Sequence, residues 1–348
     1  MKSFEKHIEK IQPQDYADGI PVPLDYNPGM NERGFFHTSN QNSDEKIFTT
    51  PTQISSLTQS WDGEKILMGA LSMAFLMPTN NFNNEVISQF TKLRIGNQSA
   101  YIRAMAFHPS DVLCGISHYN TLHLYDSEKN LFVSSLSGHK STITGVLFSS
   151  DGKTLVTSGI DQKLLTYDLI KSQQYYEIKL PHEATSLSTN LNESMVSLSM
   201  SNGQIYIFDN RQQNEAIKFQ AHSNYITSSK FSKFSENLIA SAGSDRAVKL
   251  FDVRQTVSAV CQFYRHSSTP TCVEFDNVGN LWCGSRNAEL QAWDLNTFRS
   301  IYRNLVVENG AVLSIMCSDL RNVLLVTTSA ASLLELKLKN RNEEEEAE

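Results

Sequence analysis

The chain has 348 residues, of which 40% are hydrophobic and 19% charged, and its formal net charge is −7 at pH 7. Because no apolar run approaches the ~18 residues that cross a bilayer, the composition excludes membrane insertion and predicts a soluble protein. The acidic balance, without any cluster of Lys and Arg, argues against direct binding of nucleic acid, whose phosphates attract such clusters.

The five cysteines favour a reducing compartment. They are odd in number, contain no C-x-x-C pair and mostly fall within expected strands, which indicates structural packing rather than disulfides. The first residues, Met1-Lys2-Ser3, introduce no apolar signal core. We therefore expect a cytoplasmic and/or nuclear protein.

The first 45 residues differ in composition from the rest of the chain. They carry four prolines and many Asn and Asp residues, so residues 1–45 are predicted to form an irregular N-terminal arm. The arm also contains aromatic residues, among them Tyr26, Phe35 and Phe36. Two interpretations remain open: the arm packs against the side of the folded domain, or it binds a partner protein.

Residues 46–93 contain strand-like runs. Residues 46–50 are expected to form one strand, and residues 54–78 are typical of two strands joined by a turn at Trp61-Asp62-Gly63. Residues 80–84 are predicted to form an inserted loop, which precedes a strand expected at residues 86–93.

After these strands, an aromatic residue followed by Asp recurs five times. The steps between the aspartates are 42, 41, 43 and 42 residues, and a histidine precedes four of them by 27 to 30 residues. Between these markers, runs such as residues 143–148 alternate with period two, as half-buried strands do. A repeat of this length predicts stacked β units rather than one irregular core. The pairs are Tyr125-Asp126, Tyr167-Asp168, Phe208-Asp209, Phe251-Asp252 and Trp293-Asp294, and the histidines are His139, His182, His222 and His266.

The segments from His139 to Asp168 and from His222 to Asp252 resemble repeats of the WD-repeat β-propeller family, and the resemblance covers most of the chain. It implies four antiparallel strands per repeat and a hydrogen-bonded set of His, Ser or Thr, Asp and Trp. Other repeats lack the acid. Where Phe stands in place of Trp, it has no N–H donor to replace that of the indole. We therefore expect shorter hydrogen-bond networks in these repeats. The implied sets are His139, Ser158, Asp161 and Tyr167, and His222, Ser241, Asp245 and Phe251; the departures from the acid are Tyr119, Asn202 and Asn287.

The length of the chain sets the number of repeats. Between the arm and the last ten residues lie roughly 290 residues, or seven units of about 42. We therefore predict an all-β fold over residues 46–338, a seven-bladed β-propeller of four-stranded antiparallel blades. The resemblance implies that an N-terminal strand completes the last blade, and residues 46–50 are well placed to close the ring in this way. The acidic run 343–346 predicts a disordered tail over residues 339–348.

No constellation of residues indicates catalysis. Residues 151–154 match a phosphate-binding loop poorly, because the glycine required five residues before Gly152 is Leu147. His118 and His123 are five residues apart, which predicts opposite faces of an extended strand and argues against a metal pair. The four repeat histidines are interpreted as structural groups with satisfied hydrogen bonds. We predict no enzyme, with no catalytic, metal-binding or cofactor-binding residue and no small-molecule substrate.

The function of such a propeller is expected in its loops. In the family, the loops that lead into each inner strand and those that join the second and third strands share the face most used for partners. The matching positions predict a partner surface, in which Tyr and Arg bury a large area while keeping a polar tip. The alternative is that these are ordinary exposed side chains. The positions are Tyr101, Arg103, His118, Tyr225 and Arg286.

Two repeats end in Asp-x-Arg, at Arg211 and Arg254. Residues 239–254 resemble the box of WD-repeat substrate receptors that dock on the adaptor of cullin-RING ubiquitin ligases, with Phe251 in place of Trp. The resemblance implies that both arginines face the adaptor, although the same arginine occurs in WD-repeat proteins that never meet it. The leading hypothesis is a non-catalytic scaffold that mediates protein–protein interactions within a larger intracellular complex. The alternative is a substrate receptor of such a ligase.

Overall fold

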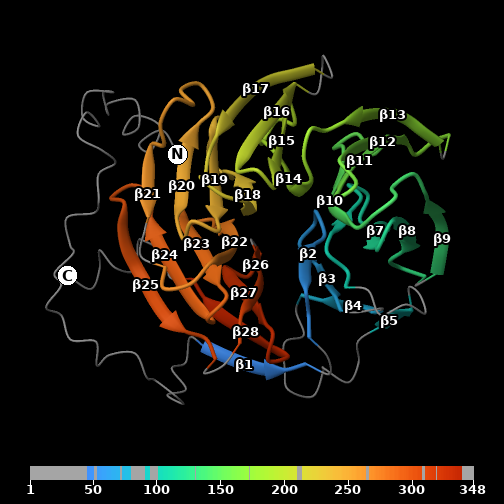
Figure 1. Cartoon of the computed structure of the whole chain (residues 1–348). Helices are drawn as coiled ribbons and strands as arrows, with labels where there is room; N and C mark the ends of the chain where they lie inside the picture. The colour runs from blue at the N-terminus through green and yellow to red at the C-terminus, as the bar shows by residue number, and fades with distance from the viewer. Residues whose placement is uncertain are drawn as a thin grey trace, which may run out of the picture.

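The computed structural model is a ring of seven four-stranded antiparallel sheets (Figure 1). It describes residues 45–50, 53–70, 73–79, 91–94, 101–129, 131–171, 173–209, 214–263, 266–307, 310–318 and 320–338. Within these ranges the structure contains β-strands and no helix. The predicted all-β, seven-bladed β-propeller is therefore confirmed. The predicted tail, and the predicted arm except for its last residue, lie outside the described residues.

Each blade begins with its inner strand and continues outward in chain order. Neighbouring strands within a blade pair antiparallel, as short alternating segments joined by tight turns do. Blade 1 contains β2 (Ser56–Gln59), β3 (Lys65–Gly69), β4 (Met73–Pro78) and β5 (Thr91–Arg94). Blade 2 contains β6 (Met105–Phe107), β7 (Leu113–His118), β8 (Thr121–Asp126) and β9 (Leu131–Leu136). Blade 3 contains β10 (Ile143–Phe148), β11 (Thr154–Gly159), β12 (Lys163–Asp168) and β13 (Gln173–Lys179).

The next three blades follow the same plan. Blade 4 contains β14 (Ala184–Thr189), β15 (Met195–Met200), β16 (Gln204–Asp209) and β17 (Asn214–Gln220). Blade 5 contains β18 (Ile226–Phe231), β19 (Leu238–Gly243), β20 (Val248–Asp252) and β21 (Cys261–Phe263). Blade 6 contains β22 (Pro270–Phe275), β23 (Asn280–Ser285), β24 (Glu289–Asp294) and β25 (Arg299–Leu305).

Blade 7 joins the two ends of the domain. It contains β26 (Val312–Ser318), β27 (Val323–Thr328), β28 (Ser332–Lys337) and, as its outer strand, β1 (Glu45–Thr49). β1 pairs antiparallel with β28 from Glu45 opposite Leu336 to Thr49 opposite Ser332, and Figure 1 shows blue β1 beside red β28. The predicted closing strand is confirmed, one residue earlier than expected. It covers the edge that β28 would otherwise expose.

The expectations for blade 1 are met where the structure describes it. Trp61-Asp62-Gly63 lies in the turn between β2 and β3, and Gly63 has a φ of 73°, which favours glycine. The strand expected at residues 86–93 is present as β5 from residue 91 onward. Residues 80–90, which include the predicted inserted loop, lie outside the described residues.

The hydrophobic core lies between the blades rather than within them. Seven buried clusters each join two neighbouring blades. The cluster between blades 7 and 1, for example, contains Ile54, Met68 and Phe75 from one blade and Leu325 and Leu333 from the other. Each blade therefore buries its faces only against its neighbours, and closure of the ring completes the core.

Hydroxyl groups connect the inner strands of neighbouring blades. In blades 3 to 7 the inner strand carries one extra residue near its start, which in four of these blades is a threonine. Thr144 Oγ1 donates to the carbonyl of Ala184 at 2.8 Å, and Thr271 Oγ1 donates to the carbonyl of Val312 at 2.6 Å. These bonds hold adjacent blades together at the centre of the ring.

Candidate functional site

The course of the strands gives the propeller two faces. We call the upper face the one formed by the loops that lead into the inner strands and by the turns that join second to third strands. The lower face is formed by the turns that join first to second and third to fourth strands. Because the strands of each blade are antiparallel, these two sets of loops lie at opposite ends of the strands.

Backbone hydrogen bonds connect the two kinds of upper-face loop in blades 3 to 7. The residue after the second strand donates its N–H to the carbonyl of the residue before the inner strand, at 2.8 to 3.0 Å. Fixed loops reduce the entropy that a surface loses when it binds a partner. The donor and acceptor residues are Ile160 and Thr142, Ser201 and Glu183, Ser244 and Tyr225, Arg286 and Thr269, and Ser329 and Ala311.

A histidine network supports the upper face in blade 3. His139 Nδ1 lies 2.9 Å from the Asp161 carboxylate, and Nε2 lies 2.8 Å from Thr157 Oγ1. The predicted hydroxyl of this network was that of Ser158, which is wrong by one residue. Adjacent strand residues point to opposite faces, and the Ser158 hydroxyl lies 3.4 Å from Thr144 Oγ1 instead. Burial raises the pKa of Tyr167, the aromatic of this repeat, to about 12.

The equivalent network in blade 5 matches the prediction. His222 Nδ1 lies 2.8 Å from one oxygen of Asp245, and Nε2 lies 2.9 Å from Ser241 Oγ. Burial alone would raise the pKa of Asp245, but the hydrogen bond from His222 and the nearby positive charges outweigh it and lower the pKa. Phe251 has no donor and packs against Phe219, with ring centroids 4.9 Å apart. The network is therefore three residues long, as expected.

In blade 6 the carboxylate lies two positions after the expected position of the network acid. Asn287 occupies the acid position, and the buried carboxylate belongs to Glu289. One oxygen of Glu289 accepts from the Ser267 hydroxyl at 2.8 Å. The other accepts from Gln291 Nε2 at 2.7 Å and Arg303 Nε at 2.5 Å. Burial works to raise the pKa of Glu289, but these hydrogen bonds prevail and lower it.

The four repeat histidines do not share one environment, which corrects the prediction that all are satisfied structural groups. His139 and His222 use both ring nitrogens. His182 is exposed. His266 is buried, yet neither ring nitrogen has a hydrogen-bond partner among the described residues, and the ring packs edge-on against Trp293 at 5.5 Å. Burial lowers the pKa of His266 to about 4, so the ring is neutral at neutral pH.

His118 and His123 lie on two strands rather than one. His118 ends β7 and His123 lies in β8, and their ring centroids are 6.3 Å apart. The predicted placement on opposite faces of one strand is wrong, because period-two alternation holds only within a strand and the chain reverses at Tyr119, where φ is 55°. Among the described residues, no group of three or more His, Cys, Asp or Glu side chains is arranged to hold a metal.

Five of the predicted partner residues lie on the upper face, but their exposure differs. Tyr101 is 45% exposed, and Arg103 and Arg286 are also exposed. Tyr225 is half-buried, and His118 is buried with 7% exposure. The exposed part of the predicted surface therefore consists of one tyrosine and two arginines, and Tyr225 adds a half-buried ring in the loop that leads into blade 5.

The two Asp-x-Arg arginines do not join this surface. Arg254 follows β20 and lies on the lower face, where its Nε and Nη2 donate to the Asp252 carboxylate at 3.0 and 2.7 Å. Its side chain is 55% exposed. Arg211 lies outside the described residues. Of the seven predicted partner residues, five therefore lie on the upper face and one, Arg254, lies on the lower face.

A family model described as WD domain, G-beta repeat matches residues 130–168 and 213–252. Each match ends at a repeat aspartate, and the two contain the histidines of the networks in blades 3 and 5. The chain belongs to the WD-repeat β-propeller family. WD-repeat propellers are generally non-catalytic interaction scaffolds, and function within them depends on individual surface sites.

The WD-repeat propeller is also similar to three curated proteins. WD repeat-containing protein 55 homolog of Dictyostelium discoideum is 26% identical, with 57% of this chain and 49% of that protein covered. WD repeat-containing protein 55 of Arabidopsis thaliana is 26% identical, with 56% of each chain covered. Histone acetyltransferase type B subunit 2 of Candida glabrata is 24% identical, with 59% and 52% covered. The chain therefore spans about half the length of these relatives.

The central channel of the WD-repeat propeller has a volume of about 530 Å³ and is lined by residues from all seven blades. Its polar lining consists mainly of Ser and Thr hydroxyls, and those of Thr144 and Thr271 already donate to neighbouring blades. Glu274 lies 3.7 Å from Lys230 Nζ and 3.3 Å from Lys233 Nζ. These contacts give the channel lining a structural role.

The cysteines behave as packing residues. All five are free, and four of them are buried. Burial raises the pKa of Cys114 and of Cys261 to about 12, and that of Cys272 to about 11. These thiols are therefore protonated at neutral pH and unsuited to act as nucleophiles.

Within the described residues, no helix is long and apolar enough to cross a bilayer.

Sequence reasoning assigned no functional role to the exposed aromatic side chains of Tyr119 and Trp61. Tyr119 is 44% exposed in the upper-face turn of blade 2, the blade that Tyr101 leads into. Trp61 is 55% exposed on the lower face, where its Nε1 donates to the carbonyl of Phe107 at 3.1 Å. In the sequence, Tyr119 stands out only as a departure from the network acid. The signal that marks it is a large aromatic residue at a turn position.

Proposed function

We propose that this chain is a non-catalytic scaffold that mediates protein–protein interactions within a larger intracellular complex. The proposal rests on one observation, the exposed Tyr and Arg side chains of the upper face, where backbone hydrogen bonds fix the turn of Arg286 and tie the carbonyl of Tyr119 to the Ile143 N–H at 2.8 Å. These residue types bury a large area in interfaces, and a pre-organised surface loses little entropy on binding. The residues that we expect to contact a partner are Tyr101, Arg103, Tyr119 and Arg286.

The two less exposed residues of the predicted surface have supporting roles in this proposal. The carbonyl of Tyr225 accepts from the Ser244 N–H at 2.9 Å, which fixes the loop that leads into β18. We expect the accessible part of its ring to contact the partner. His118 is buried next to Tyr119 in sequence and is expected to position the turn rather than to touch the partner.

The relatives support membership in an assembly. The Candida glabrata relative is by its name a subunit, so that protein is part of a larger unit. By similarity, we propose the same for this chain, in the cytoplasm and/or the nucleus. Its partners are expected to be proteins, without direct contact to nucleic acid and without a small-molecule substrate or cofactor.

A ligase receptor is the second candidate, and one feature of the lower face favours it. The two hydrogen bonds to Asp252 hold the guanidinium of Arg254 in one orientation while its side chain remains more than half exposed. A planar group fixed in this way is suited to a specific contact with a partner. If this chain is such a receptor, Arg254 and Arg211 face the adaptor.

Affinity purification followed by mass spectrometry separates the two candidates. We expect the double variant Tyr101→Ala/Arg286→Ala to reduce the recovery of the main co-purifying proteins about tenfold or more, because interface tyrosines and arginines carry much of the binding energy. The matched control is Leu131→Ala/Val133→Ala, which removes two exposed side chains from β9. The control should leave recovery unchanged.

The same experiment, with variants of the two Asp-x-Arg arginines, tests the ligase-receptor hypothesis. Recovery of a cullin adaptor that is lost in Arg211→Ala/Arg254→Ala would favour the receptor over the scaffold. Absence of any stable partner, together with turnover of a small substrate by the purified chain, would contradict both. Unchanged melting temperatures of the variants establish that a lost partner reflects a lost contact.

A further inference from the structure

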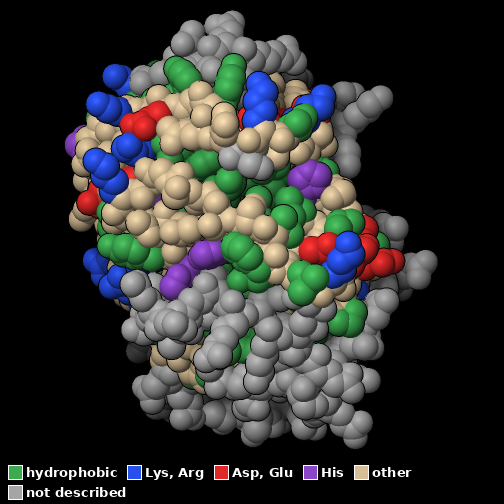
Figure 2. All heavy atoms as spheres, turned by 90° about the vertical axis from the view of Figure 1, so that its right-hand side faces the viewer, with side chains coloured by type: hydrophobic (Ala, Val, Ile, Leu, Met, Phe, Trp, Pro, Cys, Tyr) green, Lys and Arg blue, Asp and Glu red, His purple; other side chains and the backbone are tan. Residues whose placement is uncertain are grey.

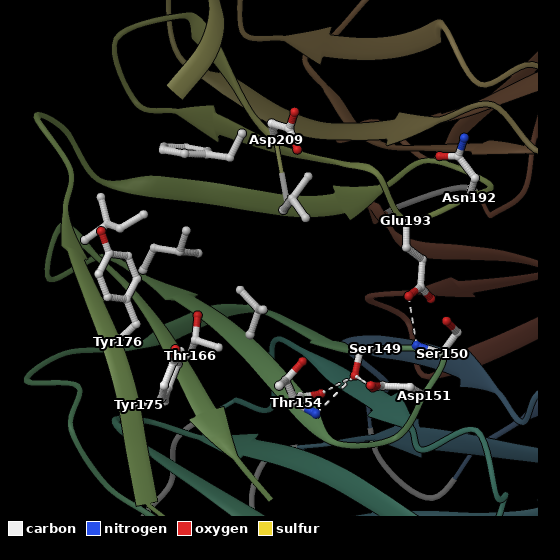
Figure 3. A pocket seen from close by; sticks show the side chains of 15 residues that line it. Ser149, Ser150, Asp151, Thr154, Thr166, Tyr175, Tyr176, Asn192, Glu193 and Asp209 are labelled. Atoms are coloured by element: carbon white, nitrogen blue, oxygen red, sulfur yellow. Dashed lines mark hydrogen bonds between the residues drawn. The ribbon is translucent and has the colours of Figure 1, made fainter. Parts of the chain in front are cut away.

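A groove lies between blades 3 and 4 at the rim of the propeller (Figure 3). Its volume is about 440 Å³, and the lower-face turns at residues 149–151 and 192–193 border it. Buried side chains from both blades form its apolar floor, among them Leu164, Val196 and Phe208. Clefts of roughly 300 to 1,000 Å³ with an apolar lining and a few polar groups are typical binding sites.

Two consecutive tyrosines of β13 form one wall of the groove. Tyr175 is 64% exposed and Tyr176 is 40% exposed. Adjacent strand residues normally point to opposite faces, but Thr166 pairs with Tyr176 while Tyr167 pairs with Gln174, so Tyr175 is an extra residue in the strand. This bulge allows both tyrosines to line the same groove. Figure 2 shows the rim that carries β9 and β13, with hydrophobic side chains in green at its surface.

The described charged side chains that line the groove are all acidic. Asp151, Glu193 and Asp209 line it, and among the described lining residues there is no Lys, Arg or His. The hydrogen bonds that Asp151 accepts from the Ser149 hydroxyl and the Lys153 N–H lower its pKa, so it is ionised at neutral pH. Its contact with Lys153 Nζ is long, 3.9 Å, and both side chains are more than half exposed, so solvent screens this pair.

The lower border of the groove is fixed by a contact between the blades. Glu193 of blade 4 accepts a hydrogen bond from the backbone N–H of Ser150 of blade 3 at 2.8 Å, as the dashed line in Figure 3 shows. The two turns that border the groove are therefore held at a constant separation. A groove with fixed walls needs little rearrangement to receive a ligand.

We propose that this groove binds a short segment of a partner protein in which an aliphatic or aromatic side chain is flanked by Lys or Arg. The apolar side chain enters between Tyr176 and the floor formed by Leu164, Val196 and Phe208. A flanking cation lies against Asp151, so the charge of the segment complements that of the groove. This site is separate from the upper face and goes beyond the proposed scaffold function.

The test begins with a library of random short peptides displayed on phage, selected against the full-length chain. We expect enriched peptides with an apolar residue next to Lys or Arg. Binding of an enriched peptide, measured by fluorescence anisotropy, should weaken about tenfold in Tyr175→Ala/Tyr176→Ala and in Asp151→Lys. The matched control is Val133→Ala, because Val133 is the equivalent bulge residue of β9 and is exposed on another blade.

Each contrary result overturns the proposal. Failure to enrich any peptide, or enrichment of acidic peptides, contradicts the assigned chemistry. If binding is lost in Tyr101→Ala/Arg286→Ala instead, the peptides occupy the upper face, and the groove is not the site while the scaffold proposal stands. If the chain forms a dimer in sedimentation that Tyr175→Ala/Tyr176→Ala dissociates, the occupant is a second copy. If a peptide of residues 1–12 displaces the selected peptide, the occupant is the N-terminus of this chain.

Discussion

Deleting residues 1–51 should lower the melting temperature of the propeller on the order of 10 °C, whereas deleting residues 339–348 should leave it unchanged. The first deletion removes β1, and with it the outer strand of blade 7 and the stretch of chain that connects this blade to blade 1. β28 then exposes its backbone donors and acceptors from Ser332 to Leu336. Non-covalent contacts alone, chiefly the cluster around Ile54, Phe75 and Leu333, would hold the ring closed.

The matched control is a chain that lacks residues 1–44 and so retains β1. Differential scanning calorimetry of the three truncated chains and the intact chain measures the effect. The chain without residues 1–44 should melt well above the chain without residues 1–51, because it keeps the pairing between β1 and β28. Equal melting temperatures of these two chains would show that β1 does not hold the ring closed.

The stability of the propeller should fall as the pH decreases from 7 to 4.5, and His266 should account for about 2 kcal/mol of the loss. The folded protein holds this histidine buried and neutral, with a pKa of about 4, whereas the ordinary value is 6.5. As the pH falls below 6.5, the unfolded chain gains a proton that the folded chain does not, so the free energy of unfolding decreases until the pH approaches 4. Burial is the main cause, and Glu289 and Arg303 act on the ring in opposite directions.

Urea denaturation of three chains at pH 7 and pH 4.5 measures this contribution. His266→Leu should lose about 2 kcal/mol less than the intact chain between the two pH values, because the variant carries no proton acceptor at this position. The matched control is His182→Gln, which changes the equivalent histidine of blade 4, where the side chain is exposed. If the free energy of unfolding of His266→Leu falls between pH 7 and pH 4.5 by as much as that of the intact chain, the histidine is not buried as a neutral ring.

The repeating β units could be predicted from the spacing of five aspartates, because each blade repeats the same succession of strands and turns, and the resemblance to the WD-repeat family then implied a propeller of four-stranded blades. Substitution within a blade changes side chains but keeps the number of residues per blade, so the period survives even where Trp is replaced by Tyr or Phe. The closing strand was predictable from the resemblance to the WD-repeat family, in which an N-terminal strand completes the last blade. Residues 46–50 were the strand-like segment well placed for that role.

The networks inside the blades were less predictable, because they depend on side-chain direction. Thr157 and Ser158 are both hydroxyl residues of one strand, and only the register of β11 against β12 decides which faces His139. The acid of blade 6 moved from position 287 to Glu289, which a search at constant spacing does not find. His266 then packs against Trp293 and has no hydrogen-bond partner in the part of the chain that the structure describes.

The partner surface could be predicted only as a set of positions. Loop positions follow from the repeat, so Tyr101, Arg103 and Arg286 were found from the alignment of blades. Exposure does not follow from the repeat, and His118 is buried at a position where a contact residue was expected. The groove between blades 3 and 4 had no counterpart in the sequence analysis, because it depends on a bulge at Tyr175 and on side chains from two blades.

Cross-linking mass spectrometry on the native complex tests most directly the claim that partners dock on the upper face. Lys140 is exposed in the loop that leads into β10 on the upper face, whereas Lys129 lies in the turn between β8 and β9 on the lower face. An amine-reactive cross-linker should join the main partner to Lys140 and not to Lys129, while Lys153 beside the groove reports separately on that site. Cross-links to the main partner that concentrate on Lys129 and spare Lys140 would contradict the assignment of the upper face.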